Sequence, residues 1–141
     1  MIMAPRVAYR QPQTGSQGFA RTKKVFGNSP VTFVAADIVL NAQCAVMRVP
    51  KGFVLQAISG TWGDIDSGAT LSMSIGDAAS PGRLVATATT MQAGGAVGAL
   101  LAGGLLYEFP DDTDILVTAT VAGVGIGPTP TLALLMEGYI K

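Results

Sequence analysis

The chain has 141 residues, of which 49% are apolar and only 13% are charged, and its mean hydropathy is +0.45. This length fits one domain with a single core. The charged fraction lies well below the roughly 25% usual for soluble domains, which argues against a freely soluble monomer. The composition therefore predicts a surface that is covered permanently, by membrane or by other protein.

The sequence contains no histidine and a single cysteine, Cys44. Catalysis by Ser-His-Asp or Cys-His groups is therefore excluded, as are an internal disulfide and a zinc or haem site built on this cysteine. We expect a buried Cys44 thiol and no cofactor. The glycine-interrupted run at 94–107 is too short to span a bilayer, and the start of the chain has no signal-peptide core. We expect no membrane partner and synthesis in the cytoplasm.

The first 30 residues differ from the rest because they are basic and rich in proline and glycine. This composition has neither helical nor strand periodicity and predicts an extended N-terminal arm over 1–30. We expect the arm to dock on protein, through its basic side chains, rather than to contact nucleic acid directly. These candidate contact residues are Arg6, Arg10, Arg21, Lys23 and Lys24.

From residue 31 onward, short runs of Val, Ile, Leu, Thr and Ala alternate with Gly, Pro, Asn and Asp. This pattern predicts an all-β domain over 31–141, folded as a two-sheet β-sandwich of jelly-roll type. The predicted strands are 31–40, 44–49, 53–62, 70–75, 84–88, 105–109, 114–121 and 131–140. The segment 93–104 fits either a glycine-rich loop or one short helix across an end of the sandwich.

Asp64, Asp66 and Asp77 lie among serines and glycines around the predicted strand at 70–75. One interpretation is a calcium site, completed by the aspartates of 111–114, because hard cations prefer several converging oxygen ligands. The spacing does not match an EF-hand loop. We favour hairpin turns in which the aspartates accept hydrogen bonds from nearby backbone and Gly68 supplies a positive φ, with no metal.

The two glutamates, Glu108 and Glu137, are the candidates for a hydrolase that works with paired carboxylates. Both lie in predicted strands, where a solvent-facing or subunit-facing position accounts for them. The glycine-rich run at 123–128 is not followed by a lysine, so it predicts a hairpin tip rather than a phosphate loop. Trp62 is expected in the core or an interface. We therefore predict no catalytic residues and no enzymatic activity.

Three stretches, 38–58, 66–86 and 107–121, follow one another in an order that carries a family resemblance. They comprise a strand ending in Val-Pro-Lys-Gly, a D-x-G-x-T-L-x-x-x-I-G-D segment, and a Tyr-Glu-Phe-Pro-Asp strand entry leading to Ile-x-Val-x-Ala-Thr. Together with a final apolar strand, this arrangement resembles the small capsid decoration proteins of tailed bacteriophages, also called cement or head-stabilisation proteins. The resemblance covers about 38–140 and leaves out the arm.

This resemblance implies a virion protein that binds the outside of the capsid and clamps neighbouring major capsid proteins. Its implied partners are the major capsid protein and copies of itself, as a homotrimer, and its implied location is the capsid surface. Whether the arm or the sandwich contacts the shell stays open. The alternative is a receptor- or carbohydrate-binding module of a phage tail or head fibre.

Overall fold

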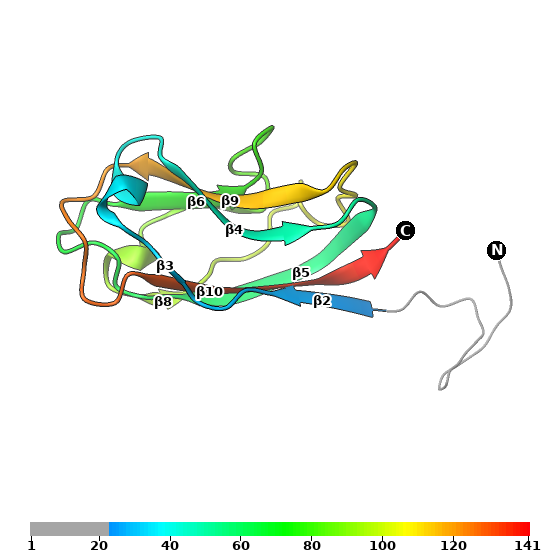
Figure 1. Ribbon diagram of the computed structural model, residues 1–141, viewed down its shortest axis with the longest axis horizontal. Coiled ribbons are helices and arrows are strands. Elements are labelled where there is room, and N and C mark those ends of the chain that lie inside the picture. The colour runs from blue at the N-terminus through cyan, green and yellow to red at the C-terminus, as the bar shows by residue number, and fades with distance from the viewer. Residues whose placement is uncertain (1–22) are drawn as a thin grey trace, which may run out of the picture.

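The computed structural model describes residues 23–141, which form two antiparallel sheets packed face to face (Figure 1). The first sheet has the order β2 (Lys23–Gly27), β10 (Thr131–Ile140), β5 (Phe53–Trp62) and β8 (Gly95–Ala96), and β3 (Val31–Thr32) also pairs with β10. The second has the order β4 (Gln43–Val49), β9 (Thr113–Val121), β6 (Ser72–Gly76) and β7 (Val85–Ala88). The predicted all-β, two-sheet sandwich is confirmed.

Two short 3₁₀ helices, η1 (Ala35–Ile38) and η2 (Thr90–Gln92), are the helical elements of residues 23–141. No helix of the described part is therefore long and apolar enough to cross a membrane.

Six of the predicted strands agree with β4, β5, β6, β7, β9 and β10 to within two residues at either end. Several of them carry apolar residues at every second position, as β10 does. In β9, for example, Ile115, Val117 and Ala119 are almost completely buried between the sheets. The Val-Pro-Lys-Gly turn also forms as expected: the Phe53 N–H donates to the Pro50 carbonyl, and Gly52 has a φ of +83° that favours glycine.

The prediction of one long strand over 31–40 is wrong. Only Val31–Thr32 is a strand, and the chain then turns through η1. Asp37 explains the turn, because its carboxylate accepts a hydrogen bond from the Val34 N–H at 2.9 Å and closes a local turn.

The predicted strand at 105–109 lies along β5 without forming a regular strand. The Leu106 N–H donates to Leu55, and the Phe109 N–H donates to Phe53. Regular pairing is interrupted because Leu106 has a left-handed φ of +61°. For 93–104 the structure agrees with the loop rather than the helix: it contains the two-residue β8 followed by turns.

Residues 1–22 of the predicted arm lie outside the described residues, but Lys23–Gly27 form β2. This strand pairs with β10, from Tyr139 opposite Lys23 to Leu135 opposite Gly27. Lysine is common on exposed edge strands because it discourages further strand pairing. The two adjacent lysines are therefore the feature of the sequence that could have indicated an edge strand here.

A chain of aromatic side chains links β2 and β5 of the first sheet to the 105–109 segment. Phe26 meets Phe53 edge-on at 5.0 Å between ring centroids, and Phe53 stacks on Phe109 at 6.2 Å. Tyr107 then meets Phe109 edge-on at 5.0 Å. Such contacts add to the burial of the rings, and they fix the 105–109 segment against β5 and β2.

The strand registers define two ends of the sandwich. At one end, on the right in Figure 1, Lys23 pairs with Tyr139, and Phe53 pairs with Ile140. At the opposite end, Leu132 pairs with Trp62. The connections 33–42, 63–71 and 122–130 all lie at this second end (Figure 1). Segments far apart in the sequence are therefore brought together at both ends.

Candidate functional site

The first end of the sandwich, which we call the charged end, carries the exposed charged side chains of residues 23–141. They come from the start of β2, the β4–β5 turn, the segment 108–114 and the C-terminus. These residues are Lys23, Lys24, Arg48, Lys51, Glu108, Asp111, Asp112, Asp114 and Lys141. Both signs are represented, so this end can form ion pairs with a partner of mixed charge.

Some of these charges already pair with one another or with a neighbour. The ion pairs are Lys23–Glu137 at 2.5 Å, Arg48–Asp114 at 2.8 Å and Lys141–Glu108 at 3.2 Å. Exposed pairs of this kind contribute only about 0–1 kcal/mol each to stability. They can be exchanged for contacts with a partner at little energetic cost.

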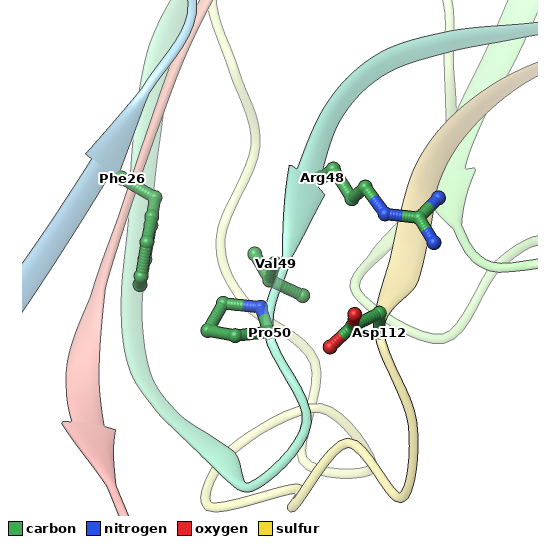
Figure 2. A pocket seen from close by; sticks show the side chains of 5 residues that line it. All are labelled: Phe26, Arg48, Val49, Pro50 and Asp112. Atoms are coloured by element: carbon green, nitrogen blue, oxygen red, sulfur yellow. The ribbon is translucent and has the colours of Figure 1, made fainter.

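A pocket of about 270 Å³ opens at the charged end between β2 and the end of β4. Figure 2 shows Phe26 on one side, Arg48 and Asp112 on the other, and Val49 and Pro50 between them. The Asp112 carboxylate accepts a hydrogen bond from the Lys51 N–H at 2.9 Å, and Arg48 is paired with Asp114. Because its polar groups have partners within the chain, the pocket holds no ready set of groups for a charged small molecule.

An ion pair between Asp77 and Arg83, which we call the Asp77–Arg83 staple, closes the loop between β6 and β7. The Asp77 carboxylate accepts hydrogen bonds from the Arg83 Nε–H and the Ser80 N–H, both at 2.8 Å. The Arg83 guanidinium lies over the Tyr107 ring, with Cζ 4.1 Å from the ring centroid. The hydrogen bond to Asp77 raises the pKa of Arg83. The predicted turn at Asp77 is confirmed, and Arg83 also contacts an aromatic ring, that of Tyr107.

A second, smaller pocket of about 200 Å³ lies beside this staple. Its lining is Asp77, Ala78, Ala79, Tyr107, Pro110, Asp111 and Thr113. The Asp77 carboxylate, its most buried charged group, is held by Arg83 and Ser80. The pocket thus follows from the shape of the loop, and its chemistry indicates no reaction.

Asp66 is the most heavily hydrogen-bonded side chain at the opposite end. It is 2% exposed, and its two oxygens accept the N–H groups of Gly68, Thr70, Leu71 and Val124 at 2.8–3.1 Å. Burial by itself raises the pKa of Asp66, but the backbone N–H donors outweigh it and hold the pKa far below the usual range. The carboxylate joins the β5–β6 loop to the β9–β10 loop.

This geometry decides between the calcium site and the turn. The Asp66 oxygens face N–H donors, which would repel a cation, and Asp77 lies at the other end of the sandwich. Residues 23–141 contain no cluster of three or more side chains that could hold a metal. Gly68 corrects one expectation: its φ is not positive, and glycine is needed because a Cβ would lie 2.4 Å from the Val124 side chain.

The remaining predicted site residues are separated. Glu108 and Glu137 belong to different surface ion pairs with lysines, which is not the arrangement of a catalytic carboxylate pair. Cys44 is half-buried in β4, where burial and then the charge of Asp37 raise the pKa of its thiol. Trp62 is 2% exposed and belongs to the core.

Of the five basic residues predicted to make contacts from the arm, two belong to the described part of the chain. Lys23 and Lys24 lie in β2 at the charged end, with Lys23 paired to Glu137. Arg6, Arg10 and Arg21 lie outside the described residues.

Exposed apolar side chains gather around the second end, which we call the apolar end. The connection 33–42 and the segment 119–123 are hydrogen-bonded there, from the Asn41 N–H to Ala119 and from the Gly123 N–H to Ile38. Their large exposed apolar residues are Val34, Val39, Leu40, Val121 and the adjoining Val124, with exposed fractions of 49–69%. Sequence reasoning missed this surface because its parts come from separate loops.

Known proteins resemble this chain in fold. No protein-family model and no curated protein matches the chain. A chain in the structure of the cyanophage Pam1 capsid asymmetric unit superposes with a TM-score of 0.70 at 18% identity, over 98% of this chain and all of the other. The two chains therefore share one fold. A chain in the capsid of Ralstonia phage GP4 matches with a TM-score of 0.72 at 18% identity, over 92% of this chain and 91% of its own length.

Proposed function

We propose that this chain is a structural, non-enzymatic virion protein that binds the outer surface of a phage capsid and stabilises it as a cement or decoration protein. The observation that carries the proposal is the likeness, over nearly the whole chain, to chains from two phage capsid structures. Matching over almost the full length means that the shared unit is the entire sandwich rather than a common two-strand motif.

The surface chemistry supports a role in assembly. A protein that clamps neighbouring subunits needs contacts to the shell and contacts to its own copies. The charged end and the apolar end offer two chemically different surfaces for such contacts. The proposed partners are the major capsid protein and copies of the chain itself, assembled as a homotrimer on the virion in the host cytoplasm.

In this proposal the shell is contacted from the charged end. The chain enters the sandwich there, through Lys23 and Lys24 at the start of β2. Arg6, Arg10 and Arg21 come before that strand in the sequence, and in this proposal all five basic residues pair with acidic groups of the shell. Charged contacts of this kind guide association and select the partner.

A carbohydrate-binding module is the weaker alternative. Sugar sites commonly stack the ligand on exposed aromatic rings, whereas Trp62 is buried and Tyr107 lies beneath the Arg83 guanidinium. Neither ring is available for stacking.

The test is to mix the purified full chain with phage heads that lack decoration and to image them by cryo-electron microscopy. We expect saturable binding, ordered density on the outer surface, and heads that resist a higher temperature. A triple variant with Arg6, Arg10 and Arg21 replaced by glutamine should bind more weakly while its unfolding curve stays unchanged. Heads that remain bare at saturating wild-type protein would refute the proposed function.

A further inference from the structure

The exposed charged side chains of residues 23–141 lie at one end of the sandwich, and half of its large exposed apolar side chains lie at the other. The nine exposed charged residues of 23–141 lie at the charged end, whereas five of the ten large apolar residues that are exposed surround the apolar end. Leu40 and Val124, with 59% and 69% of their surfaces exposed, are the most prominent of these. An apolar surface on this scale is typical of a site that is covered by a partner.

None of the carboxylates at the apolar end is fully exposed. Asp66 is buried under its backbone donors, and Asp37 is half-buried and accepts the Val34 N–H. Asp64 is half-buried with one buried oxygen that has no hydrogen-bond partner within residues 23–141. No lysine or arginine of the described residues lies at this end. The surface therefore offers a partner mainly apolar area, with the partly exposed carboxylates of Asp37 and Asp64 beside it and no basic side chain.

The surface is also held rigidly before any partner arrives. Asp66 ties the 66–71 turn to Val124, and the Gly123 N–H and Asn41 N–H bonds tie the 122–130 loop and β9 to the 33–42 connection. Val124 further rests against Gly68, where a Cβ would clash. Little conformational entropy has to be lost when such a surface is covered, which favours tight association.

We propose that the apolar end is the contact between copies of this chain. The occupant is expected to be mainly apolar, since no lysine or arginine of residues 23–141 lies here to pair with an acidic group of a partner. The same end of a second copy meets that requirement, and identical ends can meet around a symmetry axis while the nine exposed charged residues stay outside the contact. Permanent contacts between copies are also the more apolar class of interface, whereas contacts made later with a separate partner use more charge.

This inference deepens the proposed function and rests on it for its role on the capsid. With copies joined at the apolar ends, every charged end points away from the symmetry axis and is free to contact the shell. Several charged ends on one oligomer then bind together, which can strengthen attachment by about 10²–10⁴ over a single copy.

The experiment measures the mass of the full chain in solution by sedimentation equilibrium over a wide concentration range. It compares wild type with Leu40→Asp and Leu40→Lys. The matched control is Leu105→Asp, because Leu105 is 52% exposed but lies in the 98–106 loop away from the apolar end. We expect an oligomer for wild type and the control, and at least about a hundredfold weaker self-association for both Leu40 variants. Leu40→Ser provides the same test without a charge if the charged variants do not fold.

A monomeric wild type, or Leu40 variants that remain fully associated, would overturn the inference. Dissociation by Leu105→Asp alone would also overturn it and would place the contact at the 98–106 loop. Binding of the same proteins to undecorated heads separates the two proposals. Oligomeric wild type that leaves heads bare refutes the capsid role but not the contact between copies, whereas an oligomeric Leu40→Asp that no longer binds heads shows that the apolar end faces the shell.

Discussion

Replacing Asp66 by asparagine tests whether one buried carboxylate holds the two loops of the apolar end together. The change keeps the shape of the side chain, but it replaces one acceptor oxygen by an NH₂ group. In wild type, Oδ2 accepts the Thr70 N–H at 3.0 Å and the Leu71 N–H at 2.9 Å, and Oδ1 accepts the Val124 N–H at 2.8 Å. Whichever way the amide is turned, donors will face donors on one side.

The expected loss follows from these bonds. A hydrogen bond to a charged group contributes about 1.5–3 kcal/mol, and a buried donor left without an acceptor costs about 1–3 kcal/mol. Losing two such bonds at Oδ2 lowers the free energy of unfolding by about 3–5 kcal/mol, partly offset by relaxation of the loop. For a domain of this size the melting temperature should fall by roughly 10 °C.

Trp62 provides the assay, because it is the sole tryptophan and is 2% exposed. Its fluorescence reports unfolding in urea, at one fixed protein concentration so that self-association does not shift the curves. Asp112→Asn is the matched control: Asp112 is exposed and accepts one hydrogen bond, from the Lys51 N–H, so its loss should be below about 1 kcal/mol. If Asp66→Asn costs no more than Asp112→Asn, the carboxylate does not hold the loops.

Acid should destabilise the protein, because the pKa of Asp66 is lowered in the folded state: the stability it contributes is complete above the unfolded pKa of about 4 and is lost as the pH falls further. Urea midpoints should therefore fall less steeply below about pH 4 in Asp66→Asn than in wild type, and parallel slopes would contradict this. Gly138→Ala should lower the free energy of unfolding by about 3 kcal/mol or more, because the new Cβ would lie 1.9 Å from a carbonyl oxygen of β5. The control is Gly82→Ala, which has open space around the new methyl group and should lower it by less than about 1 kcal/mol. Arg83→Lys should lower stability by about 1–2 kcal/mol through loss of the guanidinium–ring contact and the Nε–H bond, while Arg48→Lys, in an exposed pair, should change it by less than about 0.5 kcal/mol. Equal effects of the two arginine substitutions would show that the staple at Arg83 is no stronger than a surface pair.

Most of the sandwich was predictable because its central strands carry their own pattern. The alternation in β6, β9 and β10 fixes which residues point inward, and glycine or proline marks the turns between them. The elements that were missed depend on contacts from elsewhere. β2 has five residues with two lysines and gains its order from pairing with β10, and η1 forms where Asp37 closes a turn on Val34.

The candidate site was harder to foresee for the same reason. Aspartate, serine and glycine at 64–68 indicate a turn, but nothing local shows that Val124, far along the chain, donates to the Asp66 carboxylate. Likewise, Leu40 and Val121 are ordinary apolar residues in the sequence. They become a surface only when the topology sets the 33–42 connection against the end of β9.

The low charge of the chain predicted a surface that membrane or other protein covers permanently, and the structure limits this expectation to part of the surface. The second sheet carries hydroxyl and amide groups that bond to one another or to the backbone. The Gln43 side chain donates to the Thr118 hydroxyl at 3.2 Å, and the Thr120 hydroxyl donates to the Ser72 carbonyl at 3.2 Å. Such a face can meet water without charged residues. The need for a partner is therefore concentrated where large apolar side chains are exposed without polar neighbours, above all at the apolar end.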